Sequence, residues 1–168
     1  RIDKIKNQGF LLLCKKKKIK TLKKIKKKIY VLLEKASSSG NLGRTIRYSY
    51  LFGIKNIILN EKDEKLVNYI TEKSSVGAIN FIKIFKIKNL KKTIEKFKKK
   101  QFKIIGLDQK GCNIEHYDFK RKKILLIIGN EIKGIKKKTK FLCESVLSIK
   151  TKKKLTLNGS DSFLLAFY

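Results

Sequence analysis

The sequence contains no proline, tryptophan or methionine, and it has one histidine and 13 acidic residues. No apolar run approaches the roughly 20 residues that a membrane-spanning helix needs, so no membrane partner is expected. The cysteines Cys14, Cys112 and Cys143 are far apart and odd in number. This spacing gives neither a disulfide framework nor a zinc site, and buried, reduced thiols in a cytoplasmic, bacterial-type protein or an organelle matrix are expected instead.

The sequence offers few candidate residues for a metal site or for a catalytic nucleophile and its base. The densest acidic group, Glu61, Asp63 and Glu64, resembles the acidic first turn of a helix, so no metal site is expected. The one histidine, His116, lies in a polar connection where a surface or hydrogen-bonding role is favoured. Neither a GxGxxG nor a Walker lysine motif occurs, which removes support for ordinary dinucleotide and nucleoside triphosphate sites.

What the sequence does contain is lysine. Of its 168 residues, 44 are basic and 13 acidic, a net charge of +31, and arginine occurs only at positions 1, 44, 47 and 121. Two explanations stay open: binding of a polyanion, and drift toward the lysine codons of an AT-rich coding sequence. An apolar content of 42% supports one folded domain over residues 1–168, with residues 1–30 as its N-terminal lead-in.

Apolar, β-rich runs recur at regular intervals, with helical patterns between them. The runs expected to form strands are 10–14, 29–33, 54–59, 81–85, 102–107, 124–128 and 146–149. The segments expected to form helices are 42–52, 62–73, 89–100, 134–144 and 157–168. This alternation predicts an α/β fold with a mostly parallel sheet and helices on both faces. Ligands of such sheets bind beyond the carboxyl ends of strands, here the loops 34–43, 106–113, 129–134 and 150–158.

The first of three unusual segments is Ser38–Arg47, a predicted turn from strand to helix. Gly40 and Gly43 permit close backbone approach, and Asn41 is a candidate cap for the helix that follows. Arg44 and Arg47 lie one helical turn apart in a chain that otherwise uses lysine. Planar, bidentate donors suit phosphate groups, so both are candidate RNA-binding residues, with plain helix-surface charge as the alternative.

The second and third segments are Ile127–Gly134 and Leu155–Ser160. In the second, a buried strand opens onto a glycine-flanked loop whose only acid is Glu131, either a functional carboxylate or the cap of the next helix. In the third, Asn158 and Ser160 precede a terminal apolar helix and are either functional or simple N-caps.

Together these segments resemble the SpoU/TrmH-type RNA ribose 2′-O-methyltransferases of the SPOUT superfamily. The first is similar to the family's Asn-x-Gly-x-x-x-Arg motif, through Asn41, Gly43 and Arg47. The second and third are similar to its Gly-x-Glu-x-x-Gly and Ser-Leu-Asn-x-Ser motifs, here 129–134 and 156–160. Ser75–Ala78 is similar to a small-residue helical stretch of the family. The closest branch methylates a guanosine of large-subunit ribosomal RNA. Lys150 and Lys152–Lys154 depart from the pattern of the third motif.

The resemblance implies an α/β domain with a C-terminal deep trefoil knot, a homodimer, and S-adenosylmethionine as cofactor. It implies cofactor contacts from residues at the strand ends and motifs, namely Leu107, Ile128, Gly129, Ile149 and Leu157. It implies a catalytic group of Asn41, Arg47, Glu131 and Asn158, partly across the dimer interface. A separate N-terminal RNA-recognition domain, found in members of this branch, is not expected in this sequence.

The resemblance favours methylation of a ribose 2′-hydroxyl in structured RNA, most closely ribosomal RNA, with transfer RNA as a further substrate. The alternative is a homologue that has lost catalysis and binds ribosomal RNA as an assembly factor. Retention of the four catalytic-group residues favours the enzyme. The altered Lys152–Lys154 loop leaves room for the alternative.

Overall fold

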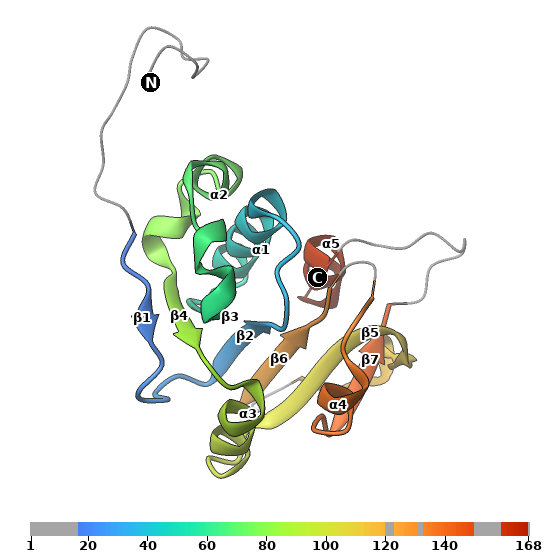
Figure 1. The fold of residues 1–168 in the computed structure, drawn as a ribbon. Helices are drawn as coiled ribbons and strands as arrows, with labels where there is room; N and C mark the ends of the chain where they lie inside the picture. The colour runs from blue at the N-terminus through green and yellow to red at the C-terminus, as the bar shows by residue number, and fades with distance from the viewer. Residues whose placement is uncertain (1–16, 120–122, 131–132, 150–158, 168) are drawn as a thin grey trace, which may run out of the picture.

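The computed structural model describes residues 17–119, 123–130, 133–149 and 159–167, and these hold one seven-stranded sheet in which every pairing is parallel. Its spatial order is β1-β4-β3-β2-β6-β5-β7 (Figure 1). The strands are β1 (Lys20–Thr21), β2 (Ile29–Leu33), β3 (Asn56–Asn60), β4 (Lys83–Ile87), β5 (Lys103–Asn113), β6 (Ile124–Ile128) and β7 (Ser145–Ser148). The α-helices are α1 (Ser39–Leu51), α2 (Tyr69–Ser74), α3 (Leu90–Lys98), α4 (Lys137–Lys140) and α5 (Gly159–Phe167), and the 3-10 helices are η1 (Glu61–Leu66), η2 (Ala78–Phe81) and η3 (Ile114–His116).

Alternate residues of each central strand feed two separate hydrophobic clusters. On β2, Val31 and Leu33 pack in a cluster that includes residues of α1 and α5. Tyr30 and Leu32, from the same strand, pack in a second cluster with residues of α3. Successive side chains of a strand point to opposite faces, so helices must cover both sides of this sheet, as Figure 1 shows. The predicted α/β fold with a parallel, two-sided sheet is confirmed.

The order of the strands reverses next to β2. The chain passes from β2 to β3 and β4 on one side, and later places β6, β5 and β7 on the other. Two crossovers therefore leave β2 and β6 in opposite directions and open a gap beyond their carboxyl ends. In open parallel sheets this switch point is where ligands bind.

Several predicted helices differ from the structure for local reasons. The predicted helix 62–73 divides into η1 and α2, because Val67 leaves helical geometry and Asn68 caps α2 by accepting from the Ile70 amide at 3.0 Å. The predicted helix 134–144 shrinks to α4, since Gly134 has a φ of 63° and Lys136 is extended. Ser75–Gly77 form a turn, with Val76 and Gly77 at positive φ, and Ala78 begins the 3-10 helix η2.

Other expectations concern strands and thiols. The short strand β1 and the extension of β5 beyond Leu107 were not predicted, and the expected strand 10–14 lies outside the described residues. The expectation of buried thiols is wrong for Cys112, which is exposed, and Cys143 is only partly buried. Across the described ranges, no group of three metal-ligating side chains gathers and no helix is long and apolar enough to cross a bilayer. His116 is exposed at the end of η3.

Candidate active site

A small crevice lies at the switch point, beyond the carboxyl ends of β2 and β6. Three of its lining residues are Asn41, Gly129 and Ser160, one from each of the three segments singled out in the sequence. The other lining residues come from β2, the loop after it, α1 and the end of β6: Leu33, Lys35, Ala36, Ser37, Leu42, Thr45 and Ile128. The fold therefore brings together three segments that lie far apart in the chain.

The first segment forms the start of α1, and its cap differs from the prediction. Ser38, not Asn41, is the N-cap, and its hydroxyl accepts from the Asn41 amide at 3.2 Å. Asn41 lies in the first turn, where its side-chain amide donates to the Ser37 hydroxyl at 2.9 Å. The helix begins at Ser39 rather than at residue 42 because the serine supplies the cap.

Arg44 joins the first segment to the third. Its Nε donates to the Ser160 hydroxyl at 3.2 Å, and its Nη2 donates to the side-chain oxygen of Asn41. Ser160 is almost fully buried and Arg44 is half-buried, so this contact fixes the start of α5 against α1. Arg47, by contrast, is exposed on α1 and is not among the lining residues. The structure thus separates the two arginines that the sequence grouped.

The second segment forms a closed loop after β6. Asn130 and Gly134 exchange backbone hydrogen bonds, from the Asn130 amide at 3.0 Å and from the Gly134 amide at 2.7 Å. A Cβ atom on Gly129 would lie 2.3 Å from the carbonyl carbon of Gly134, which is closer than real contacts allow. Both ends of the loop therefore require glycine. Glu131 lies outside the described residues.

Asp108 holds the segment that follows this loop. The pairing of β5 with β7 shifts register between Leu107 and Cys112, and this irregularity begins at Asp108. The Asp108 carboxylate accepts from the Ile135 amide at 2.9 Å and pairs with the Lys140 ammonium at 2.7 Å. Burial raises the pKa of Asp108, but the hydrogen bonds from Lys140 and the backbone outweigh it, so the net pKa is lowered.

Glu34, at the carboxyl end of β2, holds the same segment from the other side. Its buried carboxylate accepts from the Lys136 amide at 2.9 Å and from the Thr139 hydroxyl. Asp108 and Glu34 thus hold residues 135–140 in place through hydrogen bonds and one ion pair. Because their charges face donors inside the protein, these carboxylates act as structural anchors.

Two of the expected cofactor residues, Leu107 and Ile128, lie in one row of paired residues across the sheet. Leu33 pairs with Ile128, which pairs with Leu107, which pairs in turn with Leu147. Gly129 follows directly after Ile128 in the chain, and Ile149 directly follows β7. Leu107 and Ile128 are 7% and 3% exposed and pack in the cluster beneath α1, so they form the floor of this edge. Leu157 and Asn158 lie outside the described residues.

Comparison with known proteins gives one family. The SpoU rRNA Methylase family model matches residues 28–168. The chain belongs to the SpoU rRNA methylase family. A relative from Borreliella burgdorferi, an uncharacterised tRNA/rRNA methyltransferase, is 32% identical over 145 residues, which are 86% of this chain and 64% of the relative. The chain therefore spans less than two thirds of the length of that curated relative.

Solved structures of SpoU methyltransferases share the fold. The SpoU methyltransferase AviRb of Streptomyces viridochromogenes, crystallised with AdoMet, has a TM-score of 0.77 at 21% identity and covers 86% of this chain and 57% of its own. A structure named RNA 2′-O ribose methyltransferase has a TM-score of 0.73 at 15% identity and covers 96% of this chain and 59% of its own. At these identities the likeness shows the fold alone.

Sequence reasoning missed the two anchoring carboxylates of this SpoU-family chain. Glu34 and Asp108 both lie in segments that the sequence predicts to be loops bordering the site, and their only signal is their position directly after the predicted strands 29–33 and 102–107. In the structure Asp108 lies within β5. Their partners among residues 135–140 are 27 to 105 positions away in the chain, so no local pattern reveals them. Ser160 was noted as a candidate cap, and its contact with Arg44 was not anticipated.

Proposed function

We propose that this chain methylates a ribose 2′-hydroxyl of structured RNA with S-adenosylmethionine as methyl donor, and that its substrate is a guanosine of large-subunit ribosomal RNA. The observation that carries the proposal is the convergence of Asn41, Gly129 and Ser160 on one crevice at the switch point. Each residue belongs to a different SpoU-like segment. Family membership over residues 28–168 and the names of the relatives supply the reaction class.

The described residues of the site have the chemistry of an adenosine-binding surface, and the crevice between them has a volume of about 20 Å³. Leu33 and Ile128 give it an apolar floor, Leu107 pairs with Ile128 on the adjoining strand, and Gly129 lines its edge. The polar lining residues are three hydroxyls, the Asn41 amide and Lys35, with no acid among the described ones, which suits hydrogen bonding to ribose and base edges. When bound, S-adenosylmethionine supplies a methyl group activated by the sulfonium. Gly129, Leu107, Ile128, Ile149 and Leu157 are the residues we assign to its binding.

The chain's own residues must activate and position the ribose. A 2′-hydroxyl is a weak nucleophile, so its proton must be accepted or its developing negative charge stabilised. The arginine guanidinium offers hydrogen-bond donors and no acceptor, so we assign Arg47 to clamping the target phosphate and stabilising that charge. Asn41, Glu131 and Asn158 orient Arg47 and the ribose. Positioning of this kind supplies a large part of the rate in an in-line displacement.

A homodimer and a C-terminal trefoil knot are part of the proposal. Within one chain, Arg47 lies on the exposed side of α1, away from the lining of the crevice. Tyr50 and Leu51 continue this side of the helix and are 39% and 65% exposed. An arginine flanked by exposed apolar side chains suits a face that meets a second copy. Arg47 of one copy would then complete the site of the other.

Calorimetry with S-adenosylmethionine tests the cofactor assignment. We expect saturable binding to the chain at micromolar to millimolar cofactor. Absence of binding at millimolar cofactor would contradict the proposed methyltransferase activity. It would favour the alternative, a homologue without catalysis that acts as an assembly factor. Mapping of ribose methylation in ribosomal and transfer RNA, with and without the protein, then identifies the substrate.

Arg47→Lys tests the role of the arginine. The exposed position leaves the fold intact, so thermal unfolding and cofactor binding should match the wild type. Lysine cannot bind phosphate in the planar, bidentate geometry of arginine, so methyl transfer to RNA should be abolished. Wild-type turnover by Arg47→Lys would contradict the role assigned to Arg47 in methyl transfer.

A further inference from the structure

A second concave surface lies at the other end of the sheet. A groove of about 1020 Å³ is lined by 14 residues, of which eight are lysines, and none of these lining residues is acidic. We call it the lysine groove. The lysines from the chain before β2 include Lys17, Lys20, Lys26 and Lys27, and Lys83 is the first residue of β4. Asn56, the first residue of β3, also lines it, so the groove lies at the amino edge of the sheet, whereas the candidate site lies at the carboxyl edge.

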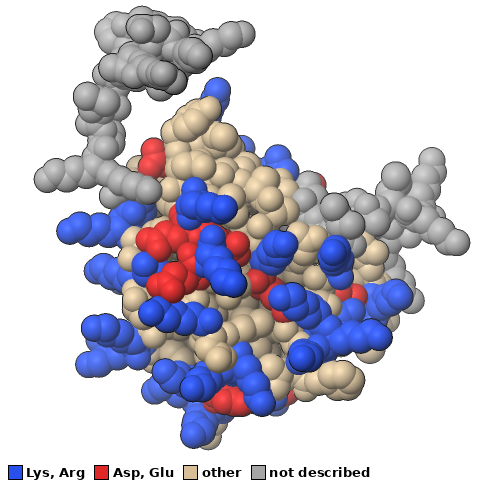
Figure 2. All heavy atoms as spheres, in the orientation of Figure 1, with Lys and Arg blue, Asp and Glu red and all other residues tan. Residues whose placement is uncertain are grey.

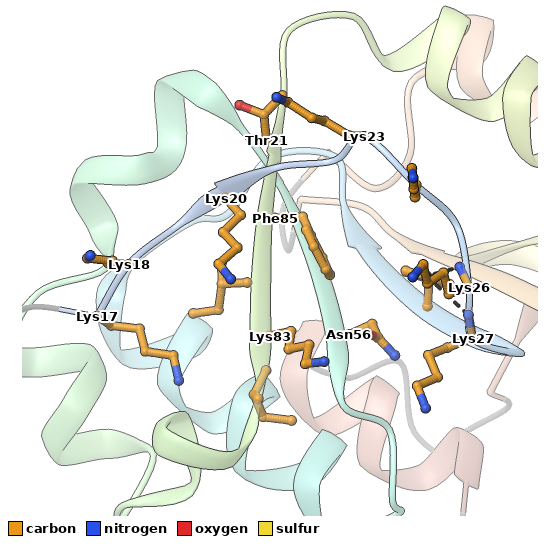
Figure 3. A pocket seen from close by; sticks show the side chains of 14 residues that line it. Lys17, Lys18, Lys20, Thr21, Lys23, Lys26, Lys27, Asn56, Lys83 and Phe85 are labelled. Atoms are coloured by element: carbon orange, nitrogen blue, oxygen red, sulfur yellow. Dashed lines mark hydrogen bonds between the residues drawn. The ribbon is translucent and has the colours of Figure 1, made fainter.

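The groove is built by ordered contacts. Residues Lys17 to Lys27 form an arch around Lys83, Phe85 and Asn56 (Figure 3). The arch is held by the pairing of β1 with β4, by a hydrogen bond from the Leu22 amide to the Lys86 carbonyl at 3.2 Å, and by Tyr30. The buried Tyr30 hydroxyl accepts from the backbone amides of Lys26 and Lys27 at 3.0 and 3.3 Å. The lysines are therefore presented on a fixed frame.

A second, smaller hollow continues this surface. It has a volume of about 410 Å³, shares Lys26 and Lys27 with the groove, and adds Lys28, Lys99, Lys100 and Lys123. Lys28 and Lys123 directly precede β2 and β6. A line of cations thus follows the amino edge of the sheet from β4 to β6.

The groove lysines, like most of the described lysines, have no acid as a partner, and what distinguishes them is that they gather in one hollow. Elsewhere in the described chain, acids pair with Lys86, Lys103 and Lys140. No described acid lies within ion-pair distance of a groove lysine. Lys17 donates to the Asn80 carbonyl at 3.1 Å, and burial lowers its pKa. Codon drift would scatter lysines without regard to acids, whereas a frame that gathers unpaired cations in one hollow calls for an external anion.

We propose that the lysine groove binds the phosphate backbone of the RNA substrate, as a contact separate from the candidate active site. This inference rests on the proposed RNA substrate. The five residues of β2 span about 16 Å, so one folded RNA can reach both ends of the sheet. Lysines contact phosphates as point charges, and the groove therefore contributes affinity and orientation without choosing the base.

The test is RNA binding by the whole chain over 50–300 mM salt, with a labelled ribosomal RNA fragment and matched variants. The groove variant combines Lys20→Gln, Lys26→Gln and Lys83→Gln, all at exposed positions. The control combines Lys91→Gln, Lys92→Gln and Lys96→Gln, which are exposed on α3 outside the groove and remove the same charge. The groove variant should lower the salt slope of log K by about 2–3 and the affinity at least about tenfold. In the control variant, the changes in the salt slope and in the logarithm of the affinity should each be at most about a third of those in the groove variant.

Equal losses of RNA affinity in the groove variant and the control would overturn the proposal, because they would show that net charge alone determines RNA binding. Loss of binding to vesicles containing phosphatidylserine, with RNA binding unchanged, would also overturn it in favour of a membrane surface. Tyr30→Phe removes the hydroxyl that holds the arch and keeps every lysine, and it should weaken RNA binding in the same direction. Cofactor binding, measured on all variants, should stay at the wild-type value. If the wild type and every variant failed to bind cofactor, the proposed function would be contradicted. The RNA-binding comparison would still test the groove.

Discussion

At the scale of single residues, the ionised carboxylate of Asp108 stabilises the folded protein. Its pKa is lowered in the folded protein because Lys140 and two backbone amides bind its charged form more strongly than burial opposes it. A lowered folded pKa means that the carboxylate stabilises the fold above its unfolded pKa of about 4, and that this stability is lost as pH falls below that value. Asp108→Asn should therefore lower the free energy of unfolding at pH 7 by about 2 kcal/mol.

The pH dependence distinguishes this charge effect from general damage. Chemical unfolding between pH 3 and pH 7 should show a smaller loss of stability on acidification in Asp108→Asn than in the wild type. Glu95→Gln, at an exposed position on α3, is the control and should follow the wild-type curve. An unchanged acid dependence in Asp108→Asn would contradict the role given to the carboxylate.

The residues of the candidate site were only partly predictable. The three segments and their order indicated Asn41, Gly129 and Ser160, which the fold brings to one crevice. The cap was placed on Asn41 instead of Ser38, because serine and asparagine cap helices about equally well and the sequence offers both. The inward position of Arg44 depends on Ser160, 116 positions away, and no local pattern encodes that pairing.

At the scale of elements, Gly43 sets how closely α1 approaches α2. A Cβ atom at this position would lie 2.5 Å from the Ser74 Cβ and 2.8 Å from the Thr71 carbonyl oxygen. Gly43→Ala should therefore force the two helices apart and lower the free energy of unfolding by about 1–3 kcal/mol. Gly40→Ala, on the same helix, meets its nearest atom at 3.9 Å and is the control. Thermal unfolding should show no loss in the control, because alanine favours the helix more than glycine does. An equal loss in both variants would contradict the packing explanation.

Elements buried on both faces were predictable, and edge or loop-bound elements were not. The strands 29–33 and 124–128 have their predicted bounds, because continuous apolar runs are typical of the centre of a parallel sheet. β1, a Lys-Thr pair on the sheet edge, carries no such pattern and was missed. The predicted helix 134–144 failed because Glu34, directly after β2, and Asp108, in β5, accept from the backbone amides of Lys136 and Ile135. Lys136 is extended, so these long-range contacts outweigh the local periodicity.

At the scale of the whole molecule, the charge is widely distributed and its local arrangement carries the information. Figure 2 shows basic side chains over most of the visible face, with acidic side chains in smaller groups among them. A net charge of +31 alone therefore indicates only that an anion is favoured. The lysine groove and the exposed Arg47 are distinguished by geometry, since one gathers unpaired cations and the other stands beside exposed apolar residues.

The same charge predicts how the stability of the molecule responds to salt. The ion pairs of the described chain join Lys86, Lys103 and Lys140 to acids. Both partners are partly exposed in the pairs of Lys86 and Lys103, whereas the Asp108 side chain that pairs with Lys140 is buried. Screening such exposed pairs costs about 0–1 kcal/mol each, whereas it relieves repulsion among 44 cations that face only 13 anions. The melting temperature should therefore rise between 20 and 200 mM sodium chloride, a range in which the Debye length falls below about 10 Å. The groove variant, with three fewer charges in one hollow, should melt higher than the wild type at 20 mM and converge with it at 200 mM. A melting temperature that falls as salt is added would show that paired charges, not repulsion, dominate the electrostatics of this fold.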